Sequence, residues 1–437
     1  MVASFKNVGR GGPRVRSGAR PRPPAGHSQA APSKGSLHGL DWLNFLVANV
    51  QTGFGPFVSV YLTSQRWTQV DIGLVLTVSS LFALIAQIPG GIFVDAIPAK
   101  RLIAAAASLA IAGSALILAM WPVFPLVLLA ELLHGAASCL IGPAIAAITL
   151  GLVGGTHIGE RLGRNVRFAS IGNGLAAALM GACGRLFSNS AVFFLTAALA
   201  ILPLFALRHI KASEIDPVRA RGGTPASDSP RLKTRLHGII DNRSLLIFAV
   251  CIAFFHLANG AMLPLTGSFV TMRSSQWATT LIAACIVVPQ LVVAVLSPWV
   301  GRQSERWGRR PLLLLGFAAL SIRGVLLGIV TSPYLLVAVQ VLDGISAAVL
   351  GVMLPLVVVD VTRGTGRFNA ALGVVGAIAG IGASLSPTIA GYMADGFGRV
   401  VTFSVLAGIA FVAMGLVWAL MPETRPESED DGTAAAA

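Results

Sequence analysis

Long apolar runs separated by short polar segments are the feature that most constrains how this chain can fold. A helix needs roughly 20 apolar residues to cross a bilayer. Twelve such runs occur, at residues 40–63, 70–94, 101–121, 123–152, 163–186, 190–210, 243–271, 277–300, 311–331, 333–361, 366–393 and 399–421. Only 11% of the residues are charged and the mean hydropathy is +0.77, whereas a soluble domain carries about 25% charged residues. The chain is therefore predicted to be an all-α integral membrane protein with 12 transmembrane helices.

The positions of the basic residues predict which loops face the cytoplasm. The formal net charge is +14, and the cations gather in the first forty residues, between 208 and 243, and in short loops such as 302–310. This pattern follows the positive-inside rule and does not indicate a nucleic-acid surface. The junctions at 121–125 and 331–333 carry almost no charge and are predicted to be hairpins on the outside. An even number of helices then places both termini in the cytoplasm of a cell (plasma or inner) membrane.

The polar segments divide the chain into five parts. Residues 1–36 are rich in Arg, Pro, Gly and Ser, with no acid before Asp41, and are predicted to be a disordered basic cytoplasmic arm. Residues 37–210 form a first six-helix half and 243–421 a second. The segment 211–242 between them, with several Pro and Gly residues, is predicted to be a cytoplasmic linker. Residues 422–437 are predicted to be an acidic disordered tail.

A charged motif occurs twice, 210 residues apart. The sequence GRQSERWGRR at 301–310 is preceded by a weaker copy, GIFVDAIPAKR, at 91–101. A carboxylate followed by a turn and two cations can form charge-assisted bonds across one end of a bundle; for the cations alone, the alternative is a loop that only fixes topology. The predicted gating residues are Gly91, Asp95, Lys100, Gly301, Glu305, Arg306, Gly308, Arg309 and Arg310.

This spacing resembles the loop signature of the major facilitator superfamily, which joins the second and third helices of each six-helix half. Further echoes support a duplication: Glu131 aligns with Gln340 at a difference of 209, and Asn49 aligns with Asn259 at 210. The resemblance covers about residues 40 to 421. It implies two pseudo-symmetric six-helix bundles that transport a solute by alternating access.

Two charged residues at membrane depth are predicted to pair. Arg323 lies nine residues before the turn at 332–333, and Asp343 lies ten residues after Pro333. Antiparallel helices joined by that turn bring the two to the same depth, so we expect an ion pair. Charges inside a membrane are costly and are often functional. Either the pair only neutralises two buried charges, or Asp343 also titrates or contacts the substrate.

Glu131 and His134 are the candidates for proton coupling. A carboxylate and an imidazole at positions i and i+3 share one helix face, and both can exchange protons near physiological pH when buried. In proton-coupled relatives this helix often carries R-x-x-q-G, and here Glu131 stands in place of the Arg and His134 in place of the Gln. The departure leaves open a simple polar contact to a neighbouring helix as the alternative.

Neutral polar residues at mid-depth predict the chemistry of the substrate cavity. The candidates are Asn44, Asn49, Gln51, Asn173, His256, Asn259 and Gln290. Amides in a mostly apolar wall suit a small organic substrate held by a few hydrogen bonds, and a ring of cations for a polyanion is missing. The alternative for His256 is a hydrogen bond between helices.

The motifs of an enzyme are missing from the sequence. It contains no G-x-x-x-x-G-K-[ST] nucleotide loop, no H-E-x-x-H and no Cys/His metal spacing, so no cofactor and no metal are expected. The predicted function is secondary transport of a small organic solute by a monomer in the bilayer, coupled to protons, with efflux of amphipathic compounds favoured. An uptake permease and a non-transporting receptor on the same fold are the alternatives.

Overall fold

The computed structural model describes residues 32–52, 54–154, 158–223, 241–266 and 275–425. These residues are almost all helical, and within these ranges only isolated bridges, between Gly223 and the 364–365 turn, show β-type pairing. The predicted basic arm lies outside the described residues except for its last five. Most of the acidic tail and residues 224–240 of the linker also lie outside them.

In its described residues, the first half contains eight α-helices. They are α1 (Lys34–Thr52), α2 (Gly55–Ser64), α3 (Gln69–Ala96), α4 (Lys100–Met120), α5 (Phe124–Val153), α6 (Ile158–Leu186), α7 (Asn189–Leu199) and α8 (Leu202–His209). Local capping sets several of these ends. Thr68 accepts a hydrogen bond from the N–H of Asp71 at the start of α3, and Ser188 does the same for α7. Two short 3-10 turns, Ala212–Glu214 and Arg219–Arg221, follow α8.

The second half contains α10 (Arg243–Asn259), α12 (Ser275–Trp307), α13 (Arg309–Ile329), α14 (Pro333–Val361) and α15 (Phe368–Leu420). α15 has 53 residues, which is about 80 Å of helix and far more than a bilayer requires. Gly398 interrupts it with a φ of 76°, close to the boundary predicted between 393 and 399. In the described part of the chain, ten helices are long and apolar enough to cross a membrane; the count of twelve stays a prediction.

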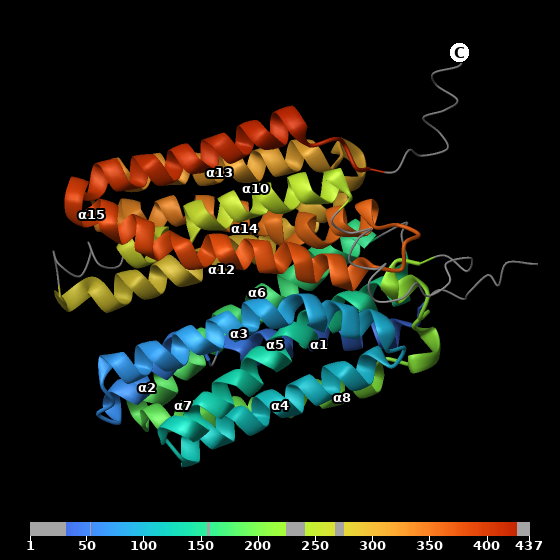
Figure 1. Cartoon of the computed structure of the whole chain (residues 1–437), viewed down its shortest axis with the longest axis horizontal. Helices are drawn as coiled ribbons and strands as arrows, with labels where there is room; N and C mark the ends of the chain where they lie inside the picture. Colours follow the sequence, from blue (N-terminus) through green and yellow to red (C-terminus); the bar gives the residue numbers. More distant parts are fainter. Residues whose placement is uncertain (1–31, 53, 155–157, 224–240, 267–274, 426–437) are drawn as a thin grey trace, which may run out of the picture. The chain divides into compact units, whose positions relative to one another are not determined.

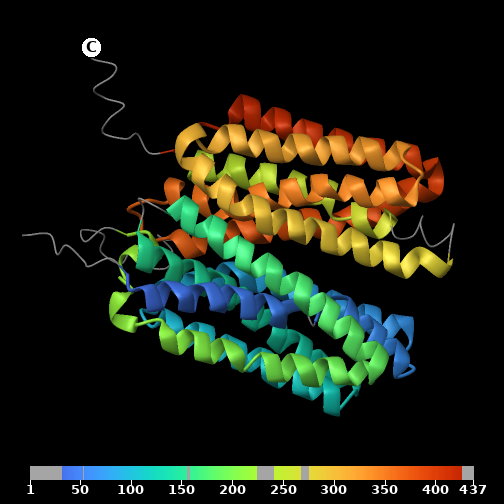
Figure 2. The same cartoon turned by 180° about the vertical axis from the view of Figure 1, so that it is seen from behind.

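Residues from Pro32 onward form one unit, in which α1–α8 lie together and α10–α15 lie together (Figure 1 and, from behind, Figure 2). Within the first half, α1 packs on α6, and α5 packs on α3 and α4; within the second, α15 packs on α10 and α13. The two groups meet where α6 contacts α12 and α3 contacts α15. We call the end with the α3–α4, α12–α13 and α14–α15 loops the basic end, and the opposite one the far end.

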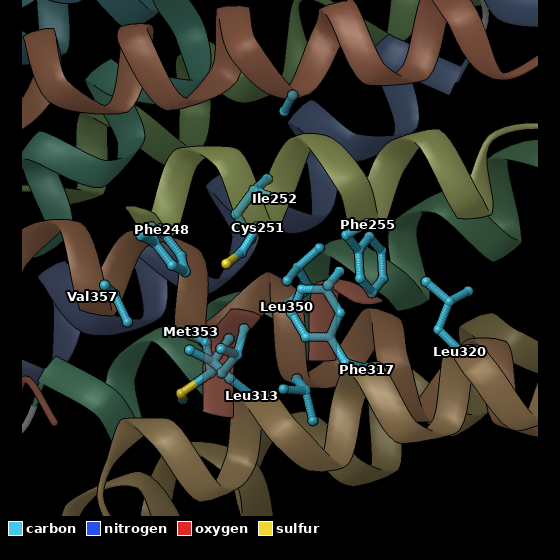
Figure 3. Packing of buried hydrophobic residues seen from close by; sticks show 14 of the residues in the cluster. Phe248, Cys251, Ile252, Phe255, Leu313, Phe317, Leu320, Leu350, Met353 and Val357 are labelled. Atoms are coloured by element: carbon cyan, nitrogen blue, oxygen red, sulfur yellow. The ribbon is translucent and has the colours of Figure 1, made fainter. Parts of the chain in front are cut away.

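Each half has its own apolar core. In the second half, aromatic and aliphatic side chains of α10, α13 and α14 pack against one another, among them Phe248, Phe255 and Phe317 (Figure 3). In the first half, Leu40, Tyr61 and Phe193 belong to a separate cluster. Since lipid is as apolar as these side chains, shape complementarity between the helices, more than exclusion from water, holds such cores together.

Several predicted boundaries differ from the structure. Residues 34–36, predicted to be part of the disordered arm, belong to α1, and the predicted first helix is divided into α1 and α2. α6 begins at Ile158, five residues before its predicted start. Hydropathy places a helix boundary where charged residues begin. The helix α6 nevertheless includes the charged side chains of its first turn, because Arg161 pairs with Asp41.

Candidate functional site

Asp95, at the end of α3, binds the N-terminus of α15 in the other half. Its carboxylate accepts hydrogen bonds from the backbone N–H groups of Asn369 (3.2 Å) and Ala370 (2.9 Å) and from the side-chain amide of Asn369 (2.8 Å). Asp95 is only 3% exposed. The first N–H groups of a helix lack intrahelical acceptors and carry partial positive charge, so this carboxylate ties the two halves together at the basic end.

Glu305, the counterpart of Asp95 in the second motif, makes a weaker contact of the same kind. Its carboxylate accepts a hydrogen bond from the N–H of Gly159, near the start of α6, at 3.2 Å. It also lies 3.4 Å from Arg309, and its side chain is about one-third (34%) exposed. Arg309 pairs in turn with the buried Asp360 at 2.8 Å. Each motif carboxylate therefore reaches a helix N-terminus of the opposite half.

Glycines allow the halves to approach closely at the basic end. A Cβ atom on Gly91 would lie 2.1 Å from the carbonyl oxygen of Asn369, and one on Gly163 would lie 2.4 Å from that of Ser297. Gly301 meets the Gly159 carbonyl at 2.3 Å in the same way. A side chain at these positions would separate α3 from α15 or α6 from α12, so the motif glycines have a packing role.

Toward the far end the two halves lie further apart. On the inner face of α15, Gly373 and Gly380 touch α3, but a Cβ on Gly391, further along this face, would have no atom of the described residues within 4 Å. The same holds for Gly73 near the start of α3, and Thr77 one turn later is exposed. In the part of the chain that the structure describes, the halves are thus in contact at the basic end and are separated at these positions of the far end.

A cavity of about 560 Å³ lies between α1, α3, α5, α6, α14 and α15. Its polar lining residues are Asn44, Gln51, Gln87, Ser138, Cys139, Thr149, Asn165 and Asn173. The other lining residues are apolar, glycine or proline, and no charged side chain from the described ranges lines it. The cavity can therefore offer a few hydrogen bonds in an otherwise apolar wall.

Three of the predicted cavity residues, Asn44, Gln51 and Asn173, line this cavity, and four do not. Asn49 donates to the Phe45 carbonyl and packs against α6. The others are His256, Asn259 and Gln290. Membrane depth alone selected all seven, but one residue along a helix turns a side chain by about 100°. Gln87, Thr149 and Asn165 escaped the prediction, although Gln87 is a lone amide in an apolar run.

A buried charge cluster, which the sequence analysis missed, adjoins the cavity. The Asp41 carboxylate lies 2.6 Å from both Arg161 and Arg164. Arg161 also donates to the Asn165 side chain (2.9 Å), and Asn165 donates to Thr149 (2.9 Å), so the cluster reaches the cavity wall. Arg161 lies before the fifth predicted run, which begins at residue 163, whereas α6 begins at Ile158 and includes both arginines.

Glu131 and His134 both lie on α5, but they contact different partners. The buried Glu131 carboxyl lies 3.4 Å from the Ser79 hydroxyl of α3, and its second oxygen has no hydrogen-bond partner among the described residues. The His134 ring stacks on Phe54 with 3.8 Å between ring centres, at the break between α1 and α2. Its Nε2 lies 3.2 Å from the Ser138 hydroxyl, which lines the cavity. His134 is therefore connected to the cavity, whereas Glu131 faces α3.

Arg323 forms the ion pair that the turn geometry predicted. Its guanidinium lies 2.7 Å from Asp343 and also donates to Asn259 (2.5 Å) and Gln340 (2.9 Å). Arg323 is 1% exposed. This network joins α10, α13 and α14 inside the second half and is separate from the cavity. Within the described ranges no three His, Cys, Asp or Glu side chains are placed to hold a metal ion.

Comparison with known proteins identifies the family. The sequence model of the Major Facilitator Superfamily matches residues 40–289 and again residues 248–436. The chain belongs to this superfamily. The two overlapping matches together span both halves, as expected if the sequence is duplicated.

The protein is similar to transporters and resistance proteins of several bacteria. It is 38% identical over 387 residues to an uncharacterized MFS-type transporter of Mycobacterium tuberculosis, covering 88% of this chain and 93% of the relative. It is 29% identical over 189 residues to Multidrug resistance protein 1 of Bacillus subtilis, 43% of this chain and 47% of that protein. Over 105 residues, 24% of this chain and 26% of the relative, it is 32% identical to a class B tetracycline resistance protein of Escherichia coli.

Solved structures share the fold. The transporter FucP in its outward conformation superimposes with a TM-score of 0.72 at 14% identity, covering 90% of this chain and 99% of that one. The human organic anion transporter MFSD10 superimposes with a TM-score of 0.66 at 16% identity, covering 89% and 100%. As a member of the superfamily, the protein is an integral membrane transporter and not an enzyme, and it binds a small-molecule substrate within the membrane.

Proposed function

We propose that this transporter exports small amphipathic organic solutes in exchange for protons. The observation that carries the proposal is the uncharged lining of the 560 Å³ cavity. A polyanion would enter it without a cation to offset its desolvation. An apolar or amphipathic solute loses little hydration free energy on entering this cavity, and hydrogen bonds to a few amides and hydroxyls fix its orientation. The names of the multidrug and tetracycline resistance relatives agree with this class of substrate.

Proton coupling is proposed to use Glu131, with His134 as the link to the cavity. The negative charge of a carboxylate that is only 5% exposed has to be offset by a cation. In the described part of the chain, Glu131 forms no ion pair, and its carboxyl contacts only the Ser79 hydroxyl. A bound proton removes that cost. When water reaches the site in the alternate conformation, Glu131 can release the proton. Ser138 lines the cavity and contacts His134, so a bound solute that displaces Ser138 would change the hydrogen bond of His134 on the helix that carries Glu131.

Alternating access is proposed to use the contacts at the basic end. Asp95 and Glu305 hold that end closed here, and their release would open the cavity to the other side. We assign the basic end to the cytoplasm of the cell membrane from the charge of its loops, with both termini on that side and the monomer as the working unit. The described conformation then faces outward.

The proposal is tested by proton flux in proteoliposomes. The purified protein is reconstituted with a pH-sensitive dye inside, and a panel of neutral, cationic and anionic amphipathic solutes is added. We expect proton movement on addition of some neutral or cationic solutes, and none with polyanions. Glu131→Gln should abolish the proton movement.

Asp395→Asn provides the matched control, because Asp395 is an exposed carboxylate on α15; it should behave as wild type. Solute flux without proton movement in either protein would refute proton coupling. Accumulation of solute inside right-side-out vesicles against its own concentration gradient, driven by an inward proton gradient, would refute export and favour uptake.

A further inference from the structure

A second cavity lies at the basic end, away from the substrate cavity. It measures about 450 Å³ and lies between the α3–α4 loop, the start of α4, the end of α8 and the 3-10 turn that follows α8. Two of the helices long and apolar enough to cross a membrane meet here: one begins at Lys100 and the other ends at His209. The cavity therefore lies at the depth of lipid headgroups. Its lining includes Lys100, Arg101 and Arg208.

Two of these cations lack an anionic partner. Neither Arg101 nor Arg208 has a carboxylate within 4 Å in the part of the chain that the structure describes. The Nε atom of Arg101 is buried and has no hydrogen-bond partner among the described residues, and the Arg208 guanidinium lies over the ring of Phe205. The carboxylates six residues from each arginine already have partners: Asp95 binds the start of α15, and Glu214 is bound by Ser33 and Lys211. Arg101 and Arg208 thus place positive charge in the cavity, with no carboxylate of the described residues paired to it.

In the second half, the position equivalent to this cavity, at the start of α13, is occupied by a carboxylate of the chain itself. The Glu423 side chain accepts hydrogen bonds from the backbone N–H groups of Arg309 (2.7 Å) and Arg310 (3.1 Å) at the start of α13. Glu423 lies three residues after the end of α15, and the residue three positions after the end of α8 is Ala212, which lines the second cavity. At the start of α4 no acidic residue occurs in the first turn, and Ala99 provides no side-chain cap. The first half therefore lacks the anion that the second half supplies itself.

The outer wall of the cavity continues as an apolar stripe on the bundle surface. Leu102, Leu109 and Leu116, spaced by seven residues on α4, are 67%, 51% and 41% exposed. Phe205 on α8 is also exposed. An acyl chain can lie along such a stripe while its headgroup occupies the basic cavity. A free phosphate would use the cations but would leave the stripe without a role.

We propose that this second cavity binds one anionic phospholipid, with its phosphate between Arg101 and Arg208 and an acyl chain along α4. The lipid belongs to the leaflet at the basic end. It replaces the carboxylate cap that Glu423 gives to α13, and so it fixes the start of α4 and the end of α8, next to the motif loop that carries Asp95.

Native mass spectrometry of the full chain, titrated with phosphatidylglycerol or phosphatidylcholine, tests the proposal. We expect one phosphatidylglycerol to bind at least tenfold more tightly than phosphatidylcholine. The double variant R101Q/R208Q should bind it about 30-fold more weakly, as expected when two cations leave an anionic lipid site. The control R167Q/R302Q removes two exposed cations of the basic end that lie outside the cavity and should bind normally.

Ala212→Glu supplies the missing carboxylate and should also expel the lipid, which provides a second test if the double variant fails to fold. Equal binding of the two lipids, or unchanged binding in both R101Q/R208Q and A212E, would overturn the proposal. Displacement of phosphatidylglycerol by inorganic phosphate at the same concentration would also overturn it, since it would identify a phosphate site that makes no use of the acyl chain.

Discussion

Replacing Asp95 by Asn should shift this transporter toward the conformation that is open at the basic end. Asp95 accepts three hydrogen bonds from the start of α15. An amide keeps one oxygen as an acceptor, but it turns an NH₂ group toward N–H donors and removes the charge. Hydrogen bonds to a charged group contribute about 1.5–3 kcal/mol, against about 1 kcal/mol for a neutral pair. We therefore expect a loss of about 2 kcal/mol, which is about a 30-fold change in the conformational equilibrium.

The shift can be measured as a distance across the far end. Spin labels at Phe187 and Tyr392, which are 80% and 83% exposed, report the separation of the halves in a background without native cysteines. Wild type should show the longer distance, and Asp95→Asn should populate a shorter one. Glu305→Gln is the matched comparison: one hydrogen bond on a side chain that is one-third exposed predicts a change of only a few-fold. Identical distance distributions in wild type and Asp95→Asn would refute the reasoning.

Three further predictions follow from single contacts. Gly91→Ala places a methyl group against the α15 backbone and should weaken closure by about 1–3 kcal/mol in the same distance assay, whereas Gly391→Ala, in open space, should change nothing. Arg323→Met should lower the free energy of unfolding in detergent by about 3 kcal/mol, and adding Asp343→Leu should restore part of it, because the single variant leaves a carboxylate without its cation; equal loss in both would contradict this. A backbone N–H just before α1 is the main cause that lowers the pKa of Glu214 to about 2. This contact should be complete above pH 4.5 and lost as the pH falls toward 2, so an NMR titration of that carboxyl with a midpoint near 4.5 would contradict it.

The sequence predicts the class and the repeat of this transporter well, because both follow from patterns along the chain. Apolar run length gives the helices, and the 210-residue offset between Asp95 and Glu305 gives the duplication. The pairing of Arg323 with Asp343 was predictable since a tight turn fixes the register of two antiparallel helices. Each of these inferences needs only local geometry.

The cavity lining was less predictable, because it depends on which face each helix turns toward the other half. Asn49 and Ala48 are neighbours in sequence, yet Ala48 lines the cavity and Asn49 packs on α6. The Asp41 cluster joins residues 120 positions apart, and no local pattern links them. The Glu423 cap was hidden for the same reason: an acidic tail after the last helix resembles a solvated end until its position beside α13 is known.

The most direct test of the account is whether solute passes through the cavity that contains Cys139. In a variant that keeps this cysteine alone, Cys139 is allowed to react with a bulky maleimide before solute flux is measured in proteoliposomes. The account predicts that a transported solute slows the labelling and that complete labelling abolishes flux, while a Cys139→Ala variant treated in the same way keeps its flux. Undiminished flux through fully labelled protein would contradict the assignment of this cavity as the substrate site.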